Sequence, residues 1–210
     1  MRYYPVFVRL DGKRVVVVGG GAVAERKAIT LIKAGAKVDV ISPTITRNLH
    51  RYKDKGLIRH IEREYRKGDL KGAFIVIAST SSREVNSAVE REAQGLGCLV
   101  NVVDTPSEGN FIAPSIVRRG PLTIAISTEG QSPAISKAIR KEIESLYGKA
   151  FSQYLMFAGR IRKEILKRIK DKKQRSGILN LLSSPMIFKI LREDGFAHAS
   201  KIIKRYMKGL

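Results

Sequence analysis

Three consecutive glycines, Gly19, Gly20 and Gly21, are the first residues whose type and spacing suggest chemistry, and Ala24 completes the pattern. In a dinucleotide site the first glycine permits a tight turn and the second lets the backbone approach the pyrophosphate. A third small residue lets the helix pack closely on its strand, and the helix N-terminus faces the phosphates with free N–H groups. Gly19, Gly21 and Ala24 have this spacing, which predicts a dinucleotide-binding turn.

The carboxylate that often binds the adenosine ribose is missing after the second expected strand, residues 37–41. That strand is followed by Ser42 and Pro43, and Asp39 comes too early to lie at its carboxyl end. Ser42, Thr44 or backbone groups could hold the ribose, and Arg47 could receive a 2′-phosphate. The sequence therefore favours NAD over NADP only weakly.

Asp104 belongs to a second constellation, residues 101–106, and closes an expected strand whose preceding residues are apolar. Ligands of open α/β sheets bind beyond the carboxyl ends of the strands, so a carboxylate there is a candidate general base. It would take a proton while a hydride leaves to the nicotinamide. An Asp before Thr105 and Pro106 is also a good turn starter, and from position alone capping is an equal alternative.

A third group of polar residues lies in residues 111–133, where hydroxyls and one guanidinium are suited to recognising ligand carboxylates. Its members are Ser115, Arg118, Ser127 and Thr128. Ser132 before Pro133 fits the cap of a helix better than a binding role. The histidines have no metal-ligand spacing and Cys98 lies in an apolar run, so the sequence predicts no metal site.

These residues must be positioned by elements that the apolar pattern predicts. Buried strands are expected at 14–18, 37–41, 57–61, 73–78 and 98–103, with helices at 23–34, 46–55 and 82–94 between them. This alternation predicts an α/β fold with a Rossmann-like, doubly wound parallel sheet. A strand at 122–127 and a helix at 133–146 follow, and only helical periodicity remains from residue 149 onward. Residues 170–177 are expected to form an exposed loop.

The chain thus divides into three expected parts: a dinucleotide-binding domain at 1–113, a small α+β segment at 114–147, and a helical domain at 148–210. Lys and Arg number 40 against 19 Asp and Glu, a net charge of +21 that is densest in the last part. Such a surface attracts polyanions, and the charge alone does not choose between nucleic acid, anionic lipid and a small polycarboxylate. One cysteine, no signal-peptide pattern and no long apolar stretch predict a cytoplasmic protein that is not membrane-bound.

Four motifs in order resemble the precorrin-2 dehydrogenase family, which is also found as the N-terminal half of multifunctional siroheme synthase. They are GGGAVAERKA at 19–28, NVVDTP at 101–106, FIAPSI at 111–116 and PLTIAISTEGQSP at 121–133. The resemblance implies NAD-dependent oxidation of precorrin-2 to sirohydrochlorin, by a homodimer joined through the middle segment. It also implies that Asp104 is essential, and that Ala22, Val23, Pro43 and Thr44 contact NAD through their backbone.

The resemblance further gives the basic charge a target, because precorrin-2 carries eight carboxylates that a cationic cleft would concentrate. Asn101 joins Ser115, Arg118, Ser127 and Thr128 as a candidate substrate-binding residue. Thr128 and Glu129 stand where members often have Ser and Gly.

Two alternative functions stay open at this point. In the first, the same pocket also inserts Fe²⁺ into sirohydrochlorin. In the second, the chain is a non-catalytic NAD-sensing regulator whose basic tail binds nucleic acid. No recognition motif for nucleic acid is evident, so we expect neither nucleic acid nor membrane among the partners.

Overall fold

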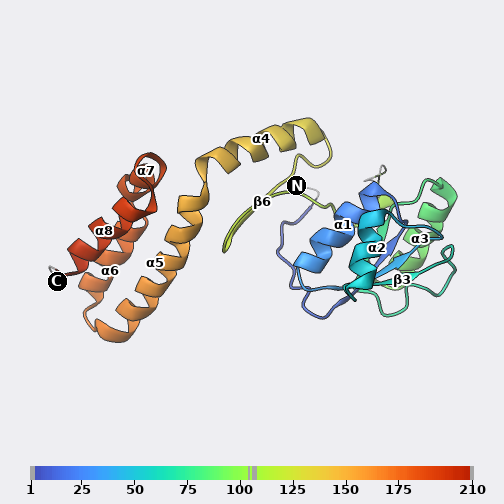
Figure 1. The fold of residues 1–210 in the computed structure, drawn as a ribbon, viewed down its shortest axis with the longest axis horizontal. Coiled ribbons are helices and arrows are strands. Elements are labelled where there is room, and N and C mark those ends of the chain that lie inside the picture. Colours follow the sequence, from blue (N-terminus) through green and yellow to red (C-terminus); the bar gives the residue numbers. More distant parts are fainter. Residues whose placement is uncertain (1–2, 104, 106–107, 209–210) are drawn as a thin grey trace. The chain divides into compact units, whose positions relative to one another are not determined.

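The computed structural model describes residues 3–103, 105 and 108–208 and divides into two compact units, Met1–Ala113 and Pro114–Leu210 (Figure 1). The first unit contains a parallel five-stranded sheet in the order β3-β2-β1-β4-β5. Its strands are β1 (Arg14–Val18), β2 (Lys37–Ile41), β3 (Ile58–Ile61), β4 (Ile75–Ala78) and β5 (Leu99–Val102). This strand order is that of a doubly wound dinucleotide-binding fold, and it confirms the predicted fold class.

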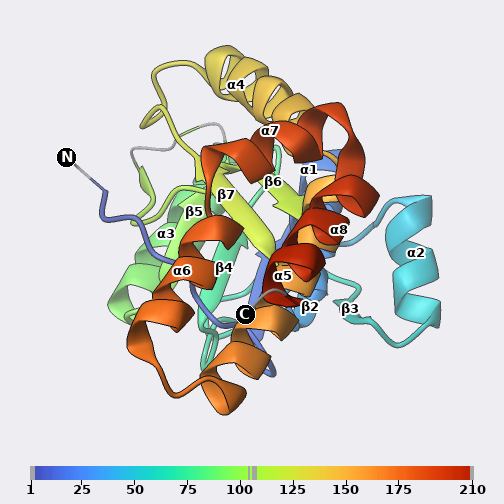
Figure 2. The ribbon, with the colours of Figure 1, turned by 90° about the vertical axis from the view of Figure 1, so that its left-hand side faces the viewer.

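Helices cover both faces of this sheet, which explains why β1 reads as an uninterrupted run of valines. The helices α1 (Ala22–Lys33) and α2 (Arg47–Asp54) pack on one face, where Ala24, Ala28 and Leu49 meet the side chains of β1 and β2. The helix α3 (Arg83–Gly95) packs on the other face through Val89 and Ala93. Figure 2 shows α2 and α3 on opposite sides of the strands.

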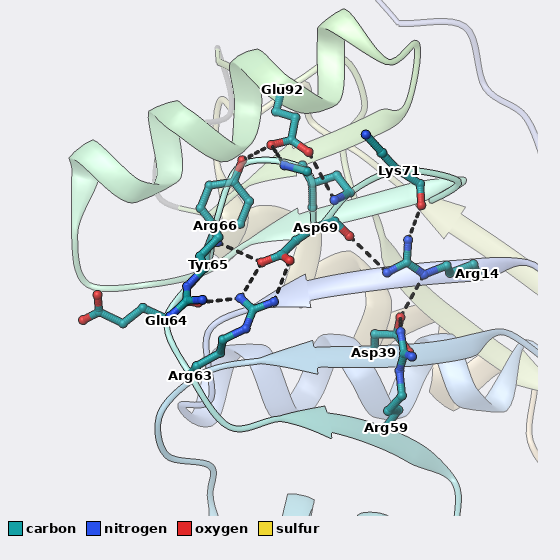
Figure 3. Close-up of polar contacts among 12 residues, drawn as sticks. Arg14, Asp39, Arg59, Arg63, Glu64, Tyr65, Arg66, Asp69, Lys71 and Glu92 are labelled. Carbon is teal, nitrogen blue, oxygen red and sulfur yellow. Dashed lines mark hydrogen bonds and ion pairs between the residues drawn. The ribbon is translucent and has the colours of Figure 1, made fainter.

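The connection between β3 and β4, residues 62–74, contains no helix, and polar side chains hold it against the sheet instead (Figure 3). The guanidinium of Arg63 donates to both carboxylate oxygens of Asp69, at 2.7 and 2.8 Å. Glu92 of α3 accepts hydrogen bonds from the Tyr65 hydroxyl at 2.5 Å and from the backbone amides of Gly68 and Leu70. Leu70 is thereby held in the core of this face, fully buried.

The second unit begins with an antiparallel hairpin, β6 (Ser115–Arg119) and β7 (Leu122–Ile126), with Gly120 at a φ of +58° in its turn. The helix α4 (Pro133–Leu146) follows and packs against the hairpin. Ser132 caps α4 by accepting a hydrogen bond from the Ile135 amide at 3.2 Å, as its sequence context predicts.

Four further helices form a separate apolar core in this unit. They are α5 (Lys149–Arg168), α6 (Lys172–Leu182), α7 (Pro185–Glu193) and α8 (Gly195–Lys208). The predicted stripe of α5 is buried at Tyr154, Phe157, Ile161 and Ile165. The Tyr154 hydroxyl also donates to the Leu182 carbonyl oxygen at 2.5 Å, which ties α5 to α6.

Two sequence expectations about this unit are wrong. Residues 170–177 do not form a loop, because α6 begins at Lys172 and Asp171 caps it by accepting from the amides of Lys173 and Gln174. The strand β6 was not expected at all. The division of the second unit at residue 147 stays a prediction.

Among the described residues, no helix is both long and apolar enough to cross a membrane.

Candidate functional site

The three glycines after β1 differ in what their backbone demands. Gly19 has a φ of +120°, and a Cβ there would lie 2.5 Å from the Ser79 carbonyl oxygen. A Cβ at Gly20 would lie 1.9 Å from the Thr44 carbonyl oxygen, so this glycine permits close approach of the loop after β2. A Cβ at Gly21 would meet nothing within 4 Å. Gly19 and Gly20 are thus required because a Cβ at either position would clash with a neighbouring carbonyl oxygen, whereas Gly21 faces open space.

The helix α1 begins directly after this open space. Gly21 is its N-cap and offers no side-chain hydrogen bond to the first turn. The amides of Ala22, Val23 and Ala24 have no acceptor within the helix, because the first turn of any α-helix lacks such partners. These N–H groups and the positive end of the helix dipole suit a pyrophosphate. The side chain of Ala24 is fully buried, as the close packing of α1 on the sheet requires.

The loop after β2 is fixed against the glycine turn by several hydrogen bonds. The Thr46 amide donates to the Gly20 carbonyl oxygen at 3.1 Å, and the Ser42 amide donates to that of Ile61. The His60 ring Nε2 lies 2.9 Å from the Ser42 carbonyl oxygen. Pro43 and Thr44, two of the residues expected to contact NAD, are exposed in this loop. The loop is therefore held in place while its middle is accessible to a ligand.

Glu25 brings a carboxylate from α1 to the same loop. It accepts from the Thr46 hydroxyl at 2.5 Å and from the Asn48 amide group at 2.9 Å. These hydrogen bonds, that of Thr46 first, lower the pKa of Glu25 below its ordinary value although burial acts the other way. The carboxylate is therefore ionised at neutral pH. Sequence reasoning missed this residue, and the signal was its place in the first turn of a helix that starts at the glycines.

Asp39 does not reach the site. It lies in the middle of β2, is 7% exposed, and pairs with Arg14 at 2.8 Å and with Arg59 at 2.6 Å. Figure 3 shows it between the two guanidiniums. The prediction that no carboxylate of β2 serves the ribose is consistent with this arrangement.

Asn101 of β5 is buried and connects three elements. Its amide nitrogen donates to the Phe111 carbonyl oxygen at 3.2 Å, and its oxygen accepts from the Lys27 ammonium of α1 at 3.2 Å. Lys27 was not among the residues singled out from the sequence. Asp104, the expected general base, lies outside the described residues.

The expected carboxylate-binding residues of the second unit do not form one cluster. Ser115 and Arg118 stand on opposite faces of the hairpin, since side chains alternate along a strand. Ser127 is exposed just beyond β7, where its hydroxyl accepts from the Glu129 amide at 3.0 Å. The Thr128 hydroxyl accepts from the Ser132 amide and donates to the Ser132 carbonyl oxygen, both at 3.1 Å. Thr128 is thus used inside the turn that leads to α4.

The residues of the first unit fit a dinucleotide. The evidence is the open space at Gly21, the free amides at the start of α1, and the accessible loop held beside them by Gly20. Within the described part of the chain, no three His, Cys, Asp or Glu side chains lie close enough together to hold a metal ion.

Comparisons with known proteins agree with this geometry. Residues 6–115 match the family described as "Putative NAD(P)-binding", and residues 119–146 match the one described as "Sirohaem biosynthesis protein central".

Among curated proteins, the chain is 37% identical over 203 residues to siroheme synthase 1 of Aeromonas salmonicida (strain A449). This match covers 96% of the chain and 43% of the relative. It is 41% identical over 175 residues to a siroheme synthase of Methylobacillus flagellatus, covering 83% of the chain and 38% of that relative. The chain thus spans about two fifths of the length of these relatives.

Among solved structures, the chain resembles SirC, precorrin-2 dehydrogenase, with a TM-score of 0.80 and 28% identity. The match covers 97% of this chain and all of that one. Because the model of the family described as "Putative NAD(P)-binding" covers more than half of the chain, the chain belongs to this NAD(P)-binding family, and it is similar to siroheme synthases and to a precorrin-2 dehydrogenase.

Proposed function

We propose that this protein oxidises precorrin-2 to sirohydrochlorin with NAD as the hydride acceptor. The observation that carries the proposal is the glycine turn, open at Gly21 and facing the free amides of α1, in a chain matched over 97% of its length by a precorrin-2 dehydrogenase. The activity of the longer siroheme synthases beyond this region is not part of the proposal.

The reaction removes two hydrogens from the tetrapyrrole and leaves a new double bond. One hydrogen leaves as a hydride, which NAD accepts when it is bound. The other leaves as a proton, and a carboxylate beyond β5 is suited to take it. We assign that step to Asp104. The α1 amides, the Gly21 backbone and the loop at Pro43 and Thr44 orient the cofactor.

NAD rather than NADP is supported by the charges near the loop after β2. The ionised carboxylate of Glu25 is bonded to Thr46 and Asn48 at this loop, where it opposes the approach of a 2′-phosphate. Arg47, the residue that could receive such a phosphate, is exposed and has no described ion-pair partner. A 2′-phosphate at this loop would therefore be repelled by Glu25, which disfavours NADP.

The excess of Lys and Arg supports a substrate with many carboxylates. At a net charge of +21, long-range attraction raises the encounter rate with a polyanion. Asn101, Ser115, Arg118, Ser127 and Thr128 stay candidate contacts for the tetrapyrrole. Of these, Thr128 is the weakest, since its hydroxyl is already satisfied within its own turn.

A homodimer joined through the hairpin and α4 is the proposed assembly. Ile135 and Ile139 lie one turn apart on α4 and are 55% and 36% exposed, and Ile116 of β6 is 41% exposed. A two-stranded sheet and one helix cannot cover these side chains, whereas a second copy related by a two-fold axis can.

The test is anaerobic oxidation of precorrin-2, followed by absorbance with NAD and then with NADP. We expect sirohydrochlorin and NADH to form in equal amounts, and NADP to react more slowly at the same concentration. Absence of turnover with both cofactors would overturn the proposed activity, and faster turnover with NADP would overturn the cofactor choice.

A further inference from the structure

Lys27 is a half-buried cation whose partner in the described structure carries no charge. Two other half-buried basic side chains of the first unit have carboxylate partners: Arg14 pairs with Asp39, and Arg63 pairs with Asp69. For Lys27, the described residues provide only the neutral amide oxygen of Asn101. A cation taken partly out of water in this way lacks the compensation that the arginines receive.

The position of the Lys27 ammonium is fixed by a chain of hydrogen bonds. Asn101 is 6% exposed, and its amide nitrogen is bound to the Phe111 carbonyl oxygen, so its oxygen points at Lys27 in one orientation. An ammonium has three N–H donors, of which Asn101 uses one. Among the residues that the structure describes, no group takes the other two donors, which lie near Asn101 in the last part of β5.

Electrostatics adds a reason for an anion at this place. Burial lowers the pKa of Lys27 below its ordinary value, and the charge of neighbouring Arg26 adds to this effect. An anion bound to the ammonium would offset both contributions, because opposite charges attract more strongly where water is partly excluded.

The pyrophosphate of the cofactor is not that anion. The backbone amides that suit the pyrophosphate lie at the start of α1, which follows β1. Asn101 belongs to β5, which lies two strands further along the sheet. Neighbouring strands are about 4.8 Å apart, so Asn101, which fixes the ammonium, belongs to a strand about 10 Å from β1. Ligands of such sheets bind beyond the carboxyl ends of the strands, and Asn101 is the last residue but one of β5, close to that end.

We propose that the Lys27 ammonium, oriented by Asn101, binds a carboxylate of the tetrapyrrole at the carboxyl end of β5. This inference rests on the proposed function and adds a substrate-binding residue to it. The contact is one charge-assisted hydrogen bond among several, which sets affinity and orientation.

The experiment measures the affinity of the purified protein for sirohydrochlorin, the product in the proposed reaction, by anaerobic absorbance titration. Lys27→Met keeps the length of the stem and removes the charge, and we expect affinity to fall about tenfold. Lys27→Arg restores a cation and should recover most of the affinity. The dissociation constant for NAD and the melting temperature should stay near wild type. For precorrin-2 turnover, KM should rise more than kcat falls.

Lys33→Met is the matched control, because it removes an exposed cation from the last turn of the same helix. We expect it to leave sirohydrochlorin affinity within a factor of two. Wild-type affinity in Lys27→Met, or an equal loss in Lys33→Met, would overturn the role of Lys27. A fall in kcat with unchanged affinity would overturn it too, because the ammonium would then act on the proton-transfer step. If the wild-type protein bound no sirohydrochlorin, the proposed function itself would fail.

Discussion

The glycine turn shows how adjacent residues of one type can be retained for different physical reasons. Gly19 supplies a positive φ, which residues with a Cβ rarely adopt, and Gly20 admits a neighbouring carbonyl oxygen. Both serve the fold. Gly21 has an extended backbone and open space in front of it, so the fold tolerates a side chain there. What a side chain at Gly21 would displace is a ligand.

Gly21→Asp should therefore abolish dinucleotide binding without harming stability. Aspartate is a good N-cap for α1, so the melting temperature should stay the same or rise slightly. Its negative charge would occupy the place of the phosphates and repel them. Titration with NAD and thermal unfolding of one preparation check both parts. For Gly20→Ala we expect the main effect on stability instead, with the free energy of unfolding lowered by about 1–3 kcal/mol because the added Cβ overpacks the turn. Unchanged NAD affinity in Gly21→Asp would remove this turn from the site.

Asp104→Asn tests the proposed general base. The amide keeps the size of the side chain and much of its capping ability, but it cannot accept the proton as the hydride leaves. We expect turnover of precorrin-2 to fall by about 10²- to 10⁴-fold, with NAD affinity unchanged. The capping alternative forecasts a modest drop in melting temperature with turnover retained. Turnover near that of the wild type would end the case for Asp104 as the base.

At the scale of elements, the connection between β3 and β4 replaces a crossover helix by hydrogen bonds to side chains. Arg14 begins β1 and donates to the carbonyl oxygens of Asp69 and Lys71, at the amino end of the sheet. The glycine turn lies at the opposite, carboxyl end. Changes in this network should therefore alter stability while leaving dinucleotide binding intact.

Asp69→Asn should lower stability in a pH-dependent way. The hydrogen bond from Arg63 is the main cause that holds the pKa of Asp69 below its ordinary value. A carboxylate with a lowered folded-state pKa stabilises the protein fully above its unfolded pKa, near 4, and loses this effect as the pH falls through the folded value. The difference in unfolding free energy between wild type and variant should thus be largest near pH 7 and shrink below about pH 4. Urea unfolding at pH 7 and pH 3 measures it, and a difference independent of pH would contradict the ion-pair account.

Glu129 illustrates a local departure from an otherwise regular turn. Its φ is +53°, in the left-handed region that favours glycine. A residue with a Cβ is strained there, although glycine also gains freedom in the unfolded chain. We expect Glu129→Gly to raise unfolding free energy by about 0.5 kcal/mol, measured by urea unfolding against Gly130→Ala, which should destabilise. A loss of stability in Glu129→Gly would show that the turn tolerates its side chain.

Elements with a strong apolar pattern could be predicted, and those defined by polar contacts could not. The valines of β1 and the apolar stripe of α5 predict buried surfaces, and the structure buries both. In contrast, the charged start of α6 reads as a loop, because its order comes from the cap at Asp171 and from packing further along the helix. The strand β6 was missed because three of its five side chains are polar, so that its sequence lacks an apolar run.

The candidate site divides in the same way. The turn at Gly19 and Gly21 could be found from spacing, since small residues at these intervals after an apolar strand are typical of a dinucleotide-binding turn. The roles of Glu25 and Lys27 could not, because each depends on a partner far along the chain, Thr46 and Asn101 respectively. From sequence alone, a charged residue on a helix is interpreted as solvent-exposed, and only the fold reveals its hydrogen-bond partner.

At the scale of the whole molecule, the two units bury their apolar residues in separate cores. The sheet of the first unit has one core on each face, and α5 to α8 enclose the core of the second. The hairpin and α4 leave Ile116, Ile135, Ile139 and Leu146 exposed outside these cores. An exposed apolar patch of this kind marks an interaction surface.

That patch leads to a prediction about assembly. We expect the protein to sediment as a dimer at micromolar concentration, because burying Ile135, Ile139 and Ile116 against a second copy would remove their apolar surface from water. Ile135→Lys places a charge in the proposed interface and should shift the protein toward the monomer without lowering the stability of the helical core. Met186→Lys is the control, since Met186 is 52% exposed on α7 and lies outside the hairpin and α4. A wild-type protein that sediments as a monomer, or a Met186→Lys variant that dissociates as fully as Ile135→Lys, would contradict an interface formed by the hairpin and α4.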